Sequence, residues 1–376
     1  MSRWKKKVKH IVSKIVYGCL LAALPTPKKK EPQDEKIAVV CLAALGDFIT
    51  YCSVARELHR QGKQLTLICR KNVGIEEFAS QTNYFDTIIA LSHQWRNRIK
   101  NIHRLHQVCT NTVMVAPIER HILSDIYASA ISANVHFLPD TEEGCSLPFL
   151  KRQMDKRVGC LVPITAQNEQ ERYTQYLRGC GFYNGSIMPF VFDWAMNRKA
   201  PERLCFGIFP GAGGSDAKLW PVERFAWVAE QLRGTTGCKI LILGTASERS
   251  LGDHLCGLLK GNAINLCGQT KLDDLIICLQ ECSIVLANDS GGAHLSVACG
   301  VPTVIVCGCW EYGRFYPNPY LPSNCRAVIA SPSSRTCIPC GQSQPECVES
   351  GAAPCVLSVT KEDVLIAARE CLQSEK

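Results

Sequence analysis

The segment Ser283–Gly308 constrains the fold more than any other part of the chain, because its patterning changes from strand to helix and back within a short stretch. An apolar strand pattern, a polar glycine-containing loop, a helical pattern and a second apolar strand pattern cover, in turn, Ile284–Ala287, 288–292, Ala293–Cys299 and Thr303–Cys307. Gly300 suits the left-handed backbone position that ends a helix, and Pro302 cannot extend one. Two apolar strands joined by a helix form a βαβ unit, so the sequence predicts an α/β protein with parallel sheets.

The same alternation recurs along the rest of the chain and divides it into two halves. Further strand patterns lie at Ile37–Leu42, Gln64–Cys69, Thr87–Leu91 and Thr112–Ala116 in the first half and at Leu204–Phe209 and Lys239–Leu243 in the second. A chain of 376 residues, of which 46% are hydrophobic, is long enough for about two domains with separate cores. We therefore predict two Rossmann-like domains, over residues 37–195 and 196–358, and a final helix within residues 359–376.

The net charge of +8 is concentrated at the N-terminus. Residues 1–36 hold ten Lys or Arg and three Asp or Glu, a net of +7, whereas the rest of the chain holds 32 and 31. A balanced body argues against a nucleic-acid-binding surface. Residues 4–20 place their apolar side chains on one helical face, so residues 1–24 are interpreted as a basic amphipathic tail on an anionic membrane surface. A signal peptide and a solvated or partner-binding helix are the alternatives, and residues 25–36 are expected to form a linker.

The chain contains 23 cysteines, most of them inside apolar runs, where they are interpreted as small buried residues in a reducing, cytoplasmic environment. The exception is a dense four-cysteine segment, residues 337–355, which contains Cys337, Cys340, Cys347 and Cys355. Four thiolates can hold a structural metal ion such as zinc or iron. Only the first pair has the two-residue spacing of zinc motifs, so a metal site, free thiols and disulfides stay open as alternatives.

Asp47 follows the first expected strand, in the sequence Leu45-Gly46-Asp47. Ligands bind to doubly wound sheets at the carboxyl ends of the strands, so Asp47 is expected at the binding edge. A carboxylate there can act as the general base that takes a proton from an acceptor hydroxyl. Because Asp is also a favoured helix N-cap, a purely structural role is the alternative.

A glycine-rich loop, residues 210–215, follows the first expected strand of the second half. Such a loop brings backbone N–H groups close to a phosphate, and Lys218 adds a positive charge at the same place. The loop matches neither the Walker sequence nor the dinucleotide-binding pattern, so an ordinary loop is the alternative. Glu248 follows the next strand and is interpreted either as a contact for ribose hydroxyls or as an acid in the first turn of a helix.

The loop within Ser283–Gly308 is the most specific candidate for ligand binding. It presents a carboxylate, a hydroxyl, glycine amides and a first-turn imidazole at a helix N-terminus, from Asp289, Ser290, Gly291, Gly292 and His294. Backbone N–H groups at a helix N-terminus bind anions such as a diphosphate. We therefore expect this loop to hold the phosphates of a ligand.

A basic stretch in the first half, residues 95–100 (WRNRIK), lies outside these motifs. Runs of charge most often form a solvated face. A contact for an anionic acceptor is the alternative interpretation.

These motifs, taken in order, resemble the signature of the glycosyltransferase family 9 heptosyltransferases. The similar elements are Leu45-Gly46-Asp47, Pro210-Gly211 with Lys218, Trp220 and Pro221, Leu243-Gly244 with Glu248, and residues 288–295 (NDSGGAHL) followed by residues 299–303 (CGVPT). They occur in the family's order over residues 37–360. The chain departs from the family pattern at Ala43 and Ala44 and within residues 211–215.

The resemblance implies a GT-B fold, in which two Rossmann-like domains with parallel sheets face a central cleft, and an inverting, metal-independent glycosyl transfer without a catalytic cofactor. It implies ADP-heptose as the nucleotide-sugar donor and, as acceptor, the core of lipopolysaccharide at the cytoplasmic face of the inner membrane. Residues 37–195 would bind the acceptor and residues 196–358 the donor, and the helix in residues 359–376 would cross back to the first domain. Asp47 is similar to the family's general base. Donor binding would fall to Gly211, Lys218, Glu248, Asp289, Ser290, Gly291, Gly292 and His294.

Three other functions are compatible with the sequence. They are a nucleotide-sugar epimerase on the same fold, a non-catalytic relative that binds sugar nucleotides, and a metal-finger protein whose basic tail binds nucleic acid. Acceptor-dependent release of a nucleoside diphosphate distinguishes a transferase from an epimerase. The balanced charge of the body argues against the nucleic-acid alternative, which a steeply salt-dependent affinity for DNA or RNA would revive.

Overall fold

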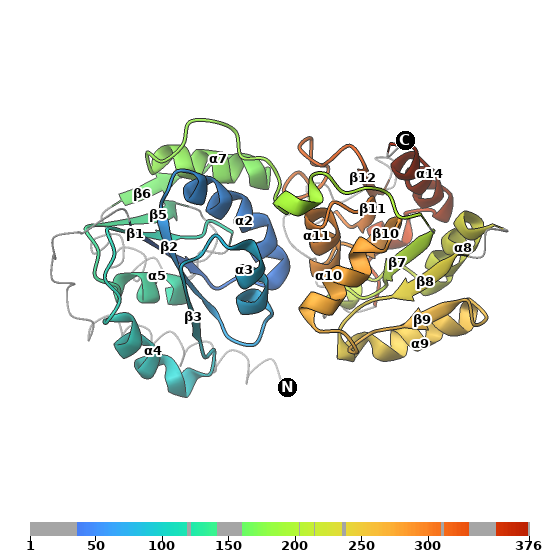
Figure 1. The fold of residues 1–376 in the computed structure, drawn as a ribbon, viewed down its shortest axis with the longest axis horizontal. Helices are drawn as coiled ribbons and strands as arrows, with labels where there is room; N and C mark the ends of the chain where they lie inside the picture. The colour runs from blue at the N-terminus through green and yellow to red at the C-terminus, as the bar shows by residue number, and fades with distance from the viewer. Residues whose placement is uncertain are drawn as a thin grey trace. The chain divides into compact units, whose positions relative to one another are not determined.

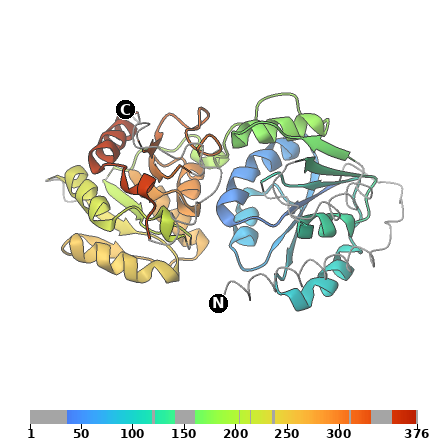
Figure 2. The same ribbon diagram turned by 180° about the vertical axis from the view of Figure 1, so that it is seen from behind.

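The structure is a computed structural model of the chain, and it describes residues 36–118, 122–140, 160–202, 204–213, 215–234, 238–309, 312–330 and 351–374. The chain forms two compact units, shown from opposite sides in Figures 1 and 2. The described residues up to Ala166, together with Gln170–Ile187, form the first unit, and Gln167–Glu169, with the described residues from Met188 onward, form the second. The change from one unit to the other thus lies near residue 187, earlier than the predicted boundary at 195.

The first unit contains a six-stranded parallel sheet of the order β3-β2-β1-β4-β5-β6. Its strands are β1 (Lys36–Cys41), β2 (Gln64–Arg70), β3 (Thr87–Leu91), β4 (Thr112–Val115), β5 (Val135–Asp140) and β6 (Cys160–Pro163). The helices between them are α2 (Leu45–Arg60), α3 (Ile75–Thr82), η1 (Trp95–Asn97), α4 (Arg98–Leu105), α5 (Ile122–Ser129) and α7 (Glu169–Gly179).

The second unit contains another six-stranded parallel sheet, of the order β12-β11-β10-β7-β8-β9. Its strands are β7 (Cys205–Phe209), β8 (Lys239–Ile242), β9 (Ala263–Asn265), β10 (Ile284–Asn288), β11 (Thr303–Cys307) and β12 (Cys325–Ile329). Its helices are η2 (Asp193–Ala195), η3 (Asp216–Lys218), α8 (Val222–Arg233), η4 (Ala246–Glu248), α9 (Arg249–Leu258), α10 (Leu272–Gln280), α11 (Gly291–Ala298), α13 (Pro354–Leu357) and α14 (Lys361–Gln373).

Both sheets have the same strand order when the strands of each are numbered along the chain: third, second, first, fourth, fifth, sixth. This is the doubly wound order, in which the direction of winding reverses between the first and fourth strands. Loops that leave those two strands run to opposite faces and open a crevice at the carboxyl edge of the sheet. The binding edges are therefore expected beside β1 and β4 in the first unit and beside β7 and β10 in the second. The predicted pair of parallel α/β sheets is confirmed.

The central strands of the second unit are buried along their whole length. Every residue of β7, β10 and β11 is buried. Strands covered by helices on both faces are expected to be continuously apolar, which is the pattern that the sequence shows. Gly300 has a φ of +69°, the left-handed conformation predicted for the end of α11.

The last helix, α14, packs within the second unit, and its predicted crossing back to the first domain stays a prediction. Its buried residues Val364, Ala368 and Cys371 belong to the core of the second unit, together with Val304 and Val306 of β11. The apolar face of α14 therefore finds its partners on the sheet of its own unit. Figure 1 shows α14 beside α8, with which it also packs.

Two other predictions concern residues outside the described ranges. The membrane interpretation of residues 1–24 falls entirely there, as does the linker up to residue 35. Among the helices that the structure does describe, none combines the length and the apolar character that crossing a bilayer requires.

Candidate functional site

The carboxyl edge of the second sheet gathers most of the predicted binding residues. Gly211 follows β7, Glu248 follows β8, and Asp289 follows β10. Since β7 pairs with both β8 and β10 in parallel, the three loops leave the sheet at one edge. This edge includes the switch point between β7 and β10, where the doubly wound fold predicts a ligand crevice.

An ion pair links two of these loops. The Nζ atom of Lys218 lies 2.8 Å from Oδ2 of Asp289, at hydrogen-bonding distance. The side chain of Asp289 is 5% exposed and that of Lys218 is 24% exposed, so the lysine is the more accessible partner of the pair. An ammonium group carries three donors, and a phosphate is the anion that such a point charge binds in nucleotide sites.

His294 stands beside this pair, in the first turn of α11. Its ring centroid lies 5.4 Å from that of Phe315 and 6.3 Å from that of Tyr316. Burial lowers the pKa of His294 below its usual value; the nearby Asp289 carboxylate opposes this shift and the Lys218 ammonium adds to it. The imidazole is therefore neutral near pH 7, and it can donate one hydrogen bond and accept another without adding charge to the site.

Asn288, the last residue of β10, holds the loop after β7 in place. It is fully buried. Its Oδ1 accepts a hydrogen bond from the backbone N–H of Trp220 at 3.1 Å, and its Nδ2 donates to the carbonyl of Pro210 at 2.7 Å. One amide thus ties Pro210, at the start of the glycine-rich loop, and Trp220, beyond its end, to the last residue of β10, next to Asp289. In the sequence, Asn288 was noted only as part of the family motif, and its role in holding the loop was not predicted.

Glu248 packs against the glycine-rich loop. Its Oε2 accepts from the backbone N–H of Thr245 at 2.7 Å, and its Oε1 accepts from the backbone N–H of Gly213 at 3.4 Å. A β-carbon at position 211 would lie 1.8 Å from Glu248 Oε1, so a side chain fits there only if the Glu248 carboxylate moves. The capping contact with Thr245 supports the helix-acid interpretation of Glu248, and contact with a ribose stays a prediction.

The N-terminus of α11 follows Asp289 along the chain. Ser290 is the N-cap and has an extended backbone, and its side chain makes no capping hydrogen bond. A β-carbon on Gly292 would come within 2.5 Å of the Phe209 ring, so glycine allows the helix to start close to the end of β7. The first N–H groups of a helix have no partner within the helix, which makes this end suited to an anion.

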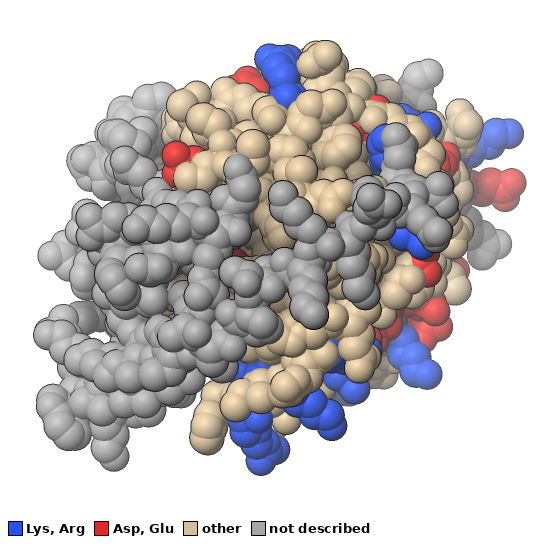
Figure 3. Space-filling model, turned by 90° about the vertical axis from the view of Figure 1, so that its left-hand side faces the viewer, with Lys and Arg blue, Asp and Glu red and all other residues tan. Residues whose placement is uncertain are grey.

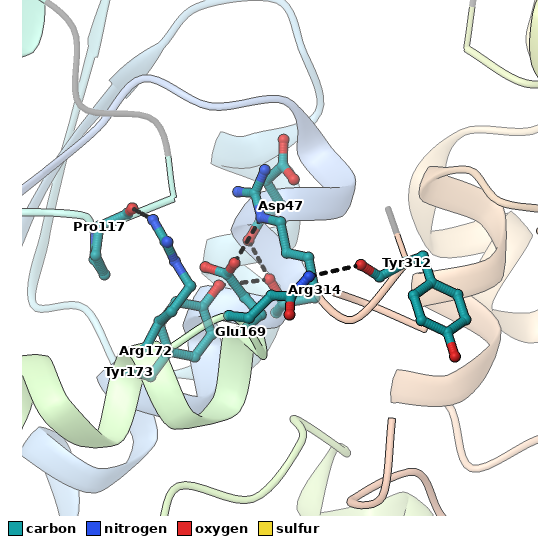
Figure 4. A network of polar contacts seen from close by, with 9 residues as sticks. Asp47, Pro117, Glu169, Arg172, Tyr173, Tyr312 and Arg314 are labelled. Atoms are coloured by element: carbon teal, nitrogen blue, oxygen red, sulfur yellow. Dashed lines mark hydrogen bonds and ion pairs between the residues drawn. The ribbon is translucent and has the colours of Figure 1, made fainter. Parts of the chain in front are cut away.

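Asp47 lies in the first unit, in the first turn of α2, after β1. The N-cap of α2 is Ala44, so the N-cap alternative for Asp47 is wrong. The carbonyl of Asp47 accepts a hydrogen bond from Thr50 Oγ1 at 2.7 Å, and this hydroxyl also lies 2.7 Å from the hydroxyl of Tyr173 on α7. Figure 4 shows this group of polar contacts. The start of α2 is thereby fastened to α7, with Asp47 half-buried at the carboxyl edge of the first sheet.

An ion pair that the sequence did not indicate joins Arg314 to Glu169. The Nε atom of Arg314 lies 2.8 Å from Oε2 of Glu169, which is fully buried (Figure 4). The Arg314 guanidinium also lies over the ring of Phe315, 4.9 Å from its centroid. Because Phe315 packs against His294, the ion pair supports one wall of the His294 site. No spacing in the sequence relates residues so far apart.

The predicted metal site cannot be traced through its ligands, because Cys337, Cys340 and Cys347 lie outside the described residues. Cys355 is buried, and its Sγ accepts a hydrogen bond from the backbone N–H of Cys309 at 3.4 Å. Across the ranges that the structure describes, no three His, Cys, Asp or Glu side chains are grouped so that they could hold a metal ion.

Comparison with known proteins shows which family the second half of the chain resembles. Residues 191–347 match the model of glycosyltransferase family 9 (heptosyltransferase). Lipopolysaccharide heptosyltransferase 2 of Escherichia coli (strain K12) is 32% identical over 111 residues, which are 28% of this chain and 32% of that protein. Lipooligosaccharide heptosyltransferase 2 of Haemophilus influenzae is 32% identical over 132 residues, 34% of this chain and 36% of that protein. The matches thus span about a third of each relative's length.

Solved structures show a similar fold over nearly the whole chain. The structure of E. coli ADP-heptose lps heptosyltransferase II has a TM-score of 0.67 and 18% identity, covering 90% of this chain and 99% of that one. A family 9 glycosyl transferase from Veillonella parvula DSM 2008 has a TM-score of 0.69 and 17% identity, covering 92% and 99%. The fold is therefore GT-B. The recognition of glycosyltransferase family 9 from the sequence motifs is confirmed, and the matched region contains Lys218, Glu248, Asp289 and His294.

Proposed function

We propose that the chain is a glycosyltransferase that moves a heptose from ADP-heptose to the core of lipopolysaccharide. The observation that carries this proposal is the Lys218–Asp289 pair at the N-terminus of α11, within the region that matches family 9. The ammonium and the helix N–H groups supply the positive field that a leaving diphosphate needs. A heptosyltransferase of the same fold from E. coli has been solved with ADP, which supports a nucleoside diphosphate as the ligand.

In the proposed reaction, the carboxylate of Asp47 takes the proton of the acceptor hydroxyl. The acceptor oxygen then bonds to the anomeric carbon of the donor sugar, on the face opposite the diphosphate. The bond between that carbon and the diphosphate oxygen breaks, so ADP leaves and the configuration is inverted. Lys218 and the amides of Gly291 and Gly292 stabilise the charge on the departing ADP. Gly211 and Ser290 border the phosphates, Glu248 contacts the nucleoside, and Asp289 contacts the sugar.

The test is release of ADP by the purified chain from ADP-heptose, with and without a heptose-deficient lipopolysaccharide. We expect release only when the acceptor is present, which an epimerase would not require. Asp47→Asn should slow transfer by roughly a hundredfold or more, since a positioned base contributes about that much, while ADP-heptose binds with unchanged affinity. Undiminished turnover in Asp47→Asn would remove this residue from the mechanism.

We further propose that the protein works at the cytoplasmic face of the inner membrane, held there by residues 1–24. The support is the concentration of positive charge in residues 1–36, which suits an anionic surface. Deleting residues 1–24 should weaken binding to anionic vesicles and spare transfer to a soluble acceptor. Equal vesicle binding by the truncated chain would refute the anchor.

A further inference from the structure

The outer face of η1 and α4, in the first unit, carries side chains that the proposed reaction does not use. Trp95 is 76% exposed and Ile99 is 62% exposed, more than any other large hydrophobic side chain in the described residues. Leaving a Trp and an Ile in water is unfavourable, and adjacent exposed apolar side chains mark interaction surfaces. Trp95 and Ile99 are four positions apart, in the consecutive helices η1 and α4, so both exposed side chains belong to one short segment.

The buried side chains of α4 show how this helix is attached to the first unit. Ile102 and Leu105 are buried in the core of the first unit. Asn101 is also buried, and its Nδ2 donates to the carbonyl of Ser92 at 2.9 Å and to the hydroxyl of Tyr127 at 2.8 Å. The helix is therefore anchored by Asn101, Ile102 and Leu105, while Trp95 and Ile99 stay exposed.

Cations line the same face. Arg96, Lys100 and Arg104 repeat at the four-residue spacing of a helix, and all three are exposed. Residues 87–118 contain four Lys or Arg, three His and no Asp or Glu. Within the described ranges, Arg96 and Arg104 bond the neutral oxygens Gln94 Oε1 and Ala90 O, and none of the three cations is paired with a carboxylate. Figure 3, which views the molecule from the left-hand side of Figure 1, shows Lys and Arg side chains gathered along the lower edge of this face.

An aromatic and an aliphatic side chain flanked by unpaired cations match the chemistry of a bilayer surface. A Trp ring sits well at the boundary between headgroups and acyl chains, and an Ile gains free energy only from an apolar environment. Arg and Lys at that depth contact lipid phosphates, and each contributes roughly fivefold to partitioning onto an anionic surface. A soluble anionic glycan would use the cations but would leave Ile99 without a partner.

We propose that the η1–α4 surface, formed by Trp95, Arg96, Ile99, Lys100 and Arg104, docks the first unit onto an anionic phospholipid bilayer. This surface belongs to the folded body and is separate from residues 1–24. Docking needs neither donor nor acceptor, so its test is independent of the proposed transfer reaction.

The test measures partitioning of the full-length chain onto vesicles of phosphatidylglycerol and phosphatidylcholine by sedimentation. Trp95→Ala with Ile99→Ala should lower the partition coefficient on mixed vesicles about tenfold or more, because both apolar contacts are lost. Arg96→Glu with Lys100→Glu should lower it about tenfold or more on vesicles rich in phosphatidylglycerol and change it little on pure phosphatidylcholine. Unchanged partitioning in both double variants would overturn the proposal.

Matched controls come from the second unit. Ile277 and Ile366 are 54% and 56% exposed, and Ile277→Ala with Ile366→Ala removes two exposed aliphatic side chains elsewhere. Lys199→Glu with Lys239→Glu makes the same change of charge on exposed lysines. Both control pairs should alter partitioning less than about twofold. Losses equal to those of the η1–α4 variants would show a non-specific effect and refute the surface.

A second measurement locates Trp95 directly. Brominated lipids quench the fluorescence of a tryptophan that lies at the acyl boundary. Trp95→Phe keeps an aromatic, apolar side chain, so it should still bind vesicles but show less quenching than the unaltered chain. Equal quenching in Trp95→Phe and in the unaltered chain would contradict the proposal. A second contradicting outcome would be double variants that still bind vesicles but lose affinity for a soluble anionic oligosaccharide.

Discussion

Lys218 and Asp289 lie on loops that follow different strands, yet Nζ of the lysine is 2.8 Å from Oδ2 of the aspartate, whose side chain is 5% exposed. Removing the ammonium leaves a nearly buried carboxylate without this partner. We expect Lys218→Met to lower the free energy of unfolding by about 2 kcal/mol, as for a charge-assisted hydrogen bond, and to weaken ADP binding. Urea unfolding and calorimetric titration with ADP measure the two effects.

Lys239 provides the control for this ion pair. Its Nζ lies 3.9 Å from Glu281, but the two side chains are 51% and 60% exposed. Exposed pairs contribute between about 0 and 1 kcal/mol, so Lys239→Met should change stability little. Adding Asp289→Asn to Lys218→Met should restore part of the lost stability. A Lys218→Met variant as stable as the Lys239→Met variant would contradict the assigned role.

The pH dependence of stability should carry a contribution from His294. Its pKa is lowered in the folded state, mainly by burial, so below about pH 6.5 the unfolded chain binds a proton that the folded chain does not. The free energy of unfolding should therefore fall as the pH drops below that value. In His294→Gln this part of the pH dependence should be absent, so the difference between the two curves isolates it. Parallel curves for both proteins would show that His294 does not titrate as inferred.

Gly211 should not tolerate a side chain. The β-carbon of Gly211→Ala would lie 1.8 Å from Glu248 Oε1 and would displace the carboxylate from Thr245 and Gly213. We expect a loss of roughly 1–3 kcal/mol in stability, as for overpacking, together with weaker ADP binding. Thermal unfolding with and without ADP measures both.

Two further variants separate the clash at Gly211 from a general effect of alanine. Gly257 lies in α9, and a β-carbon there meets nothing within 4 Å, so Gly257→Ala should be neutral or stabilising by up to about 1 kcal/mol. Glu248→Ala added to Gly211→Ala removes the clashing carboxylate and should recover part of the stability. If the double variant loses more stability than the two single variants lose together, the contact between Gly211 and Glu248 is not the cause.

The buried carboxylate of Glu169 should make Arg314 important for stability. Arg314→Met leaves that carboxylate without its guanidinium partner, and breaking such a pair costs about 3 kcal/mol. It also removes the cation from the Phe315 ring beside His294, so weaker ADP binding should accompany the loss. Glu169→Gln combined with Arg314→Met should be more stable than Arg314→Met alone. Denaturant unfolding that shows equal stabilities would contradict this.

Local patterns in the sequence were enough to predict most strands of both sheets. Continuous apolar runs located β1, β7, β10 and β11 to within a residue or two, because strands covered on both faces contain little else. The end of α11 at Gly300 was predicted because a glycine in the left-handed conformation commonly ends a helix, and φ at Gly300 is +69°. Within residues 92–160, α5 and β5 were not predicted, because they are short and carry no clear periodicity.

The candidate site, too, could be predicted from the sequence only in part. The sequence by itself determined which loops follow the strands, and hence that Lys218, Glu248 and Asp289 belong to a binding edge. Only the tertiary structure decided that Lys218 pairs with Asp289, that Glu248 packs on the glycine loop, and that α14 packs on its own unit. No pattern in the sequence predicted the pairing of Arg314 with Glu169 either. The physical reason is that periodicity and turn chemistry act between near neighbours along the chain, whereas contacts between distant residues depend on the order in which the strands assemble.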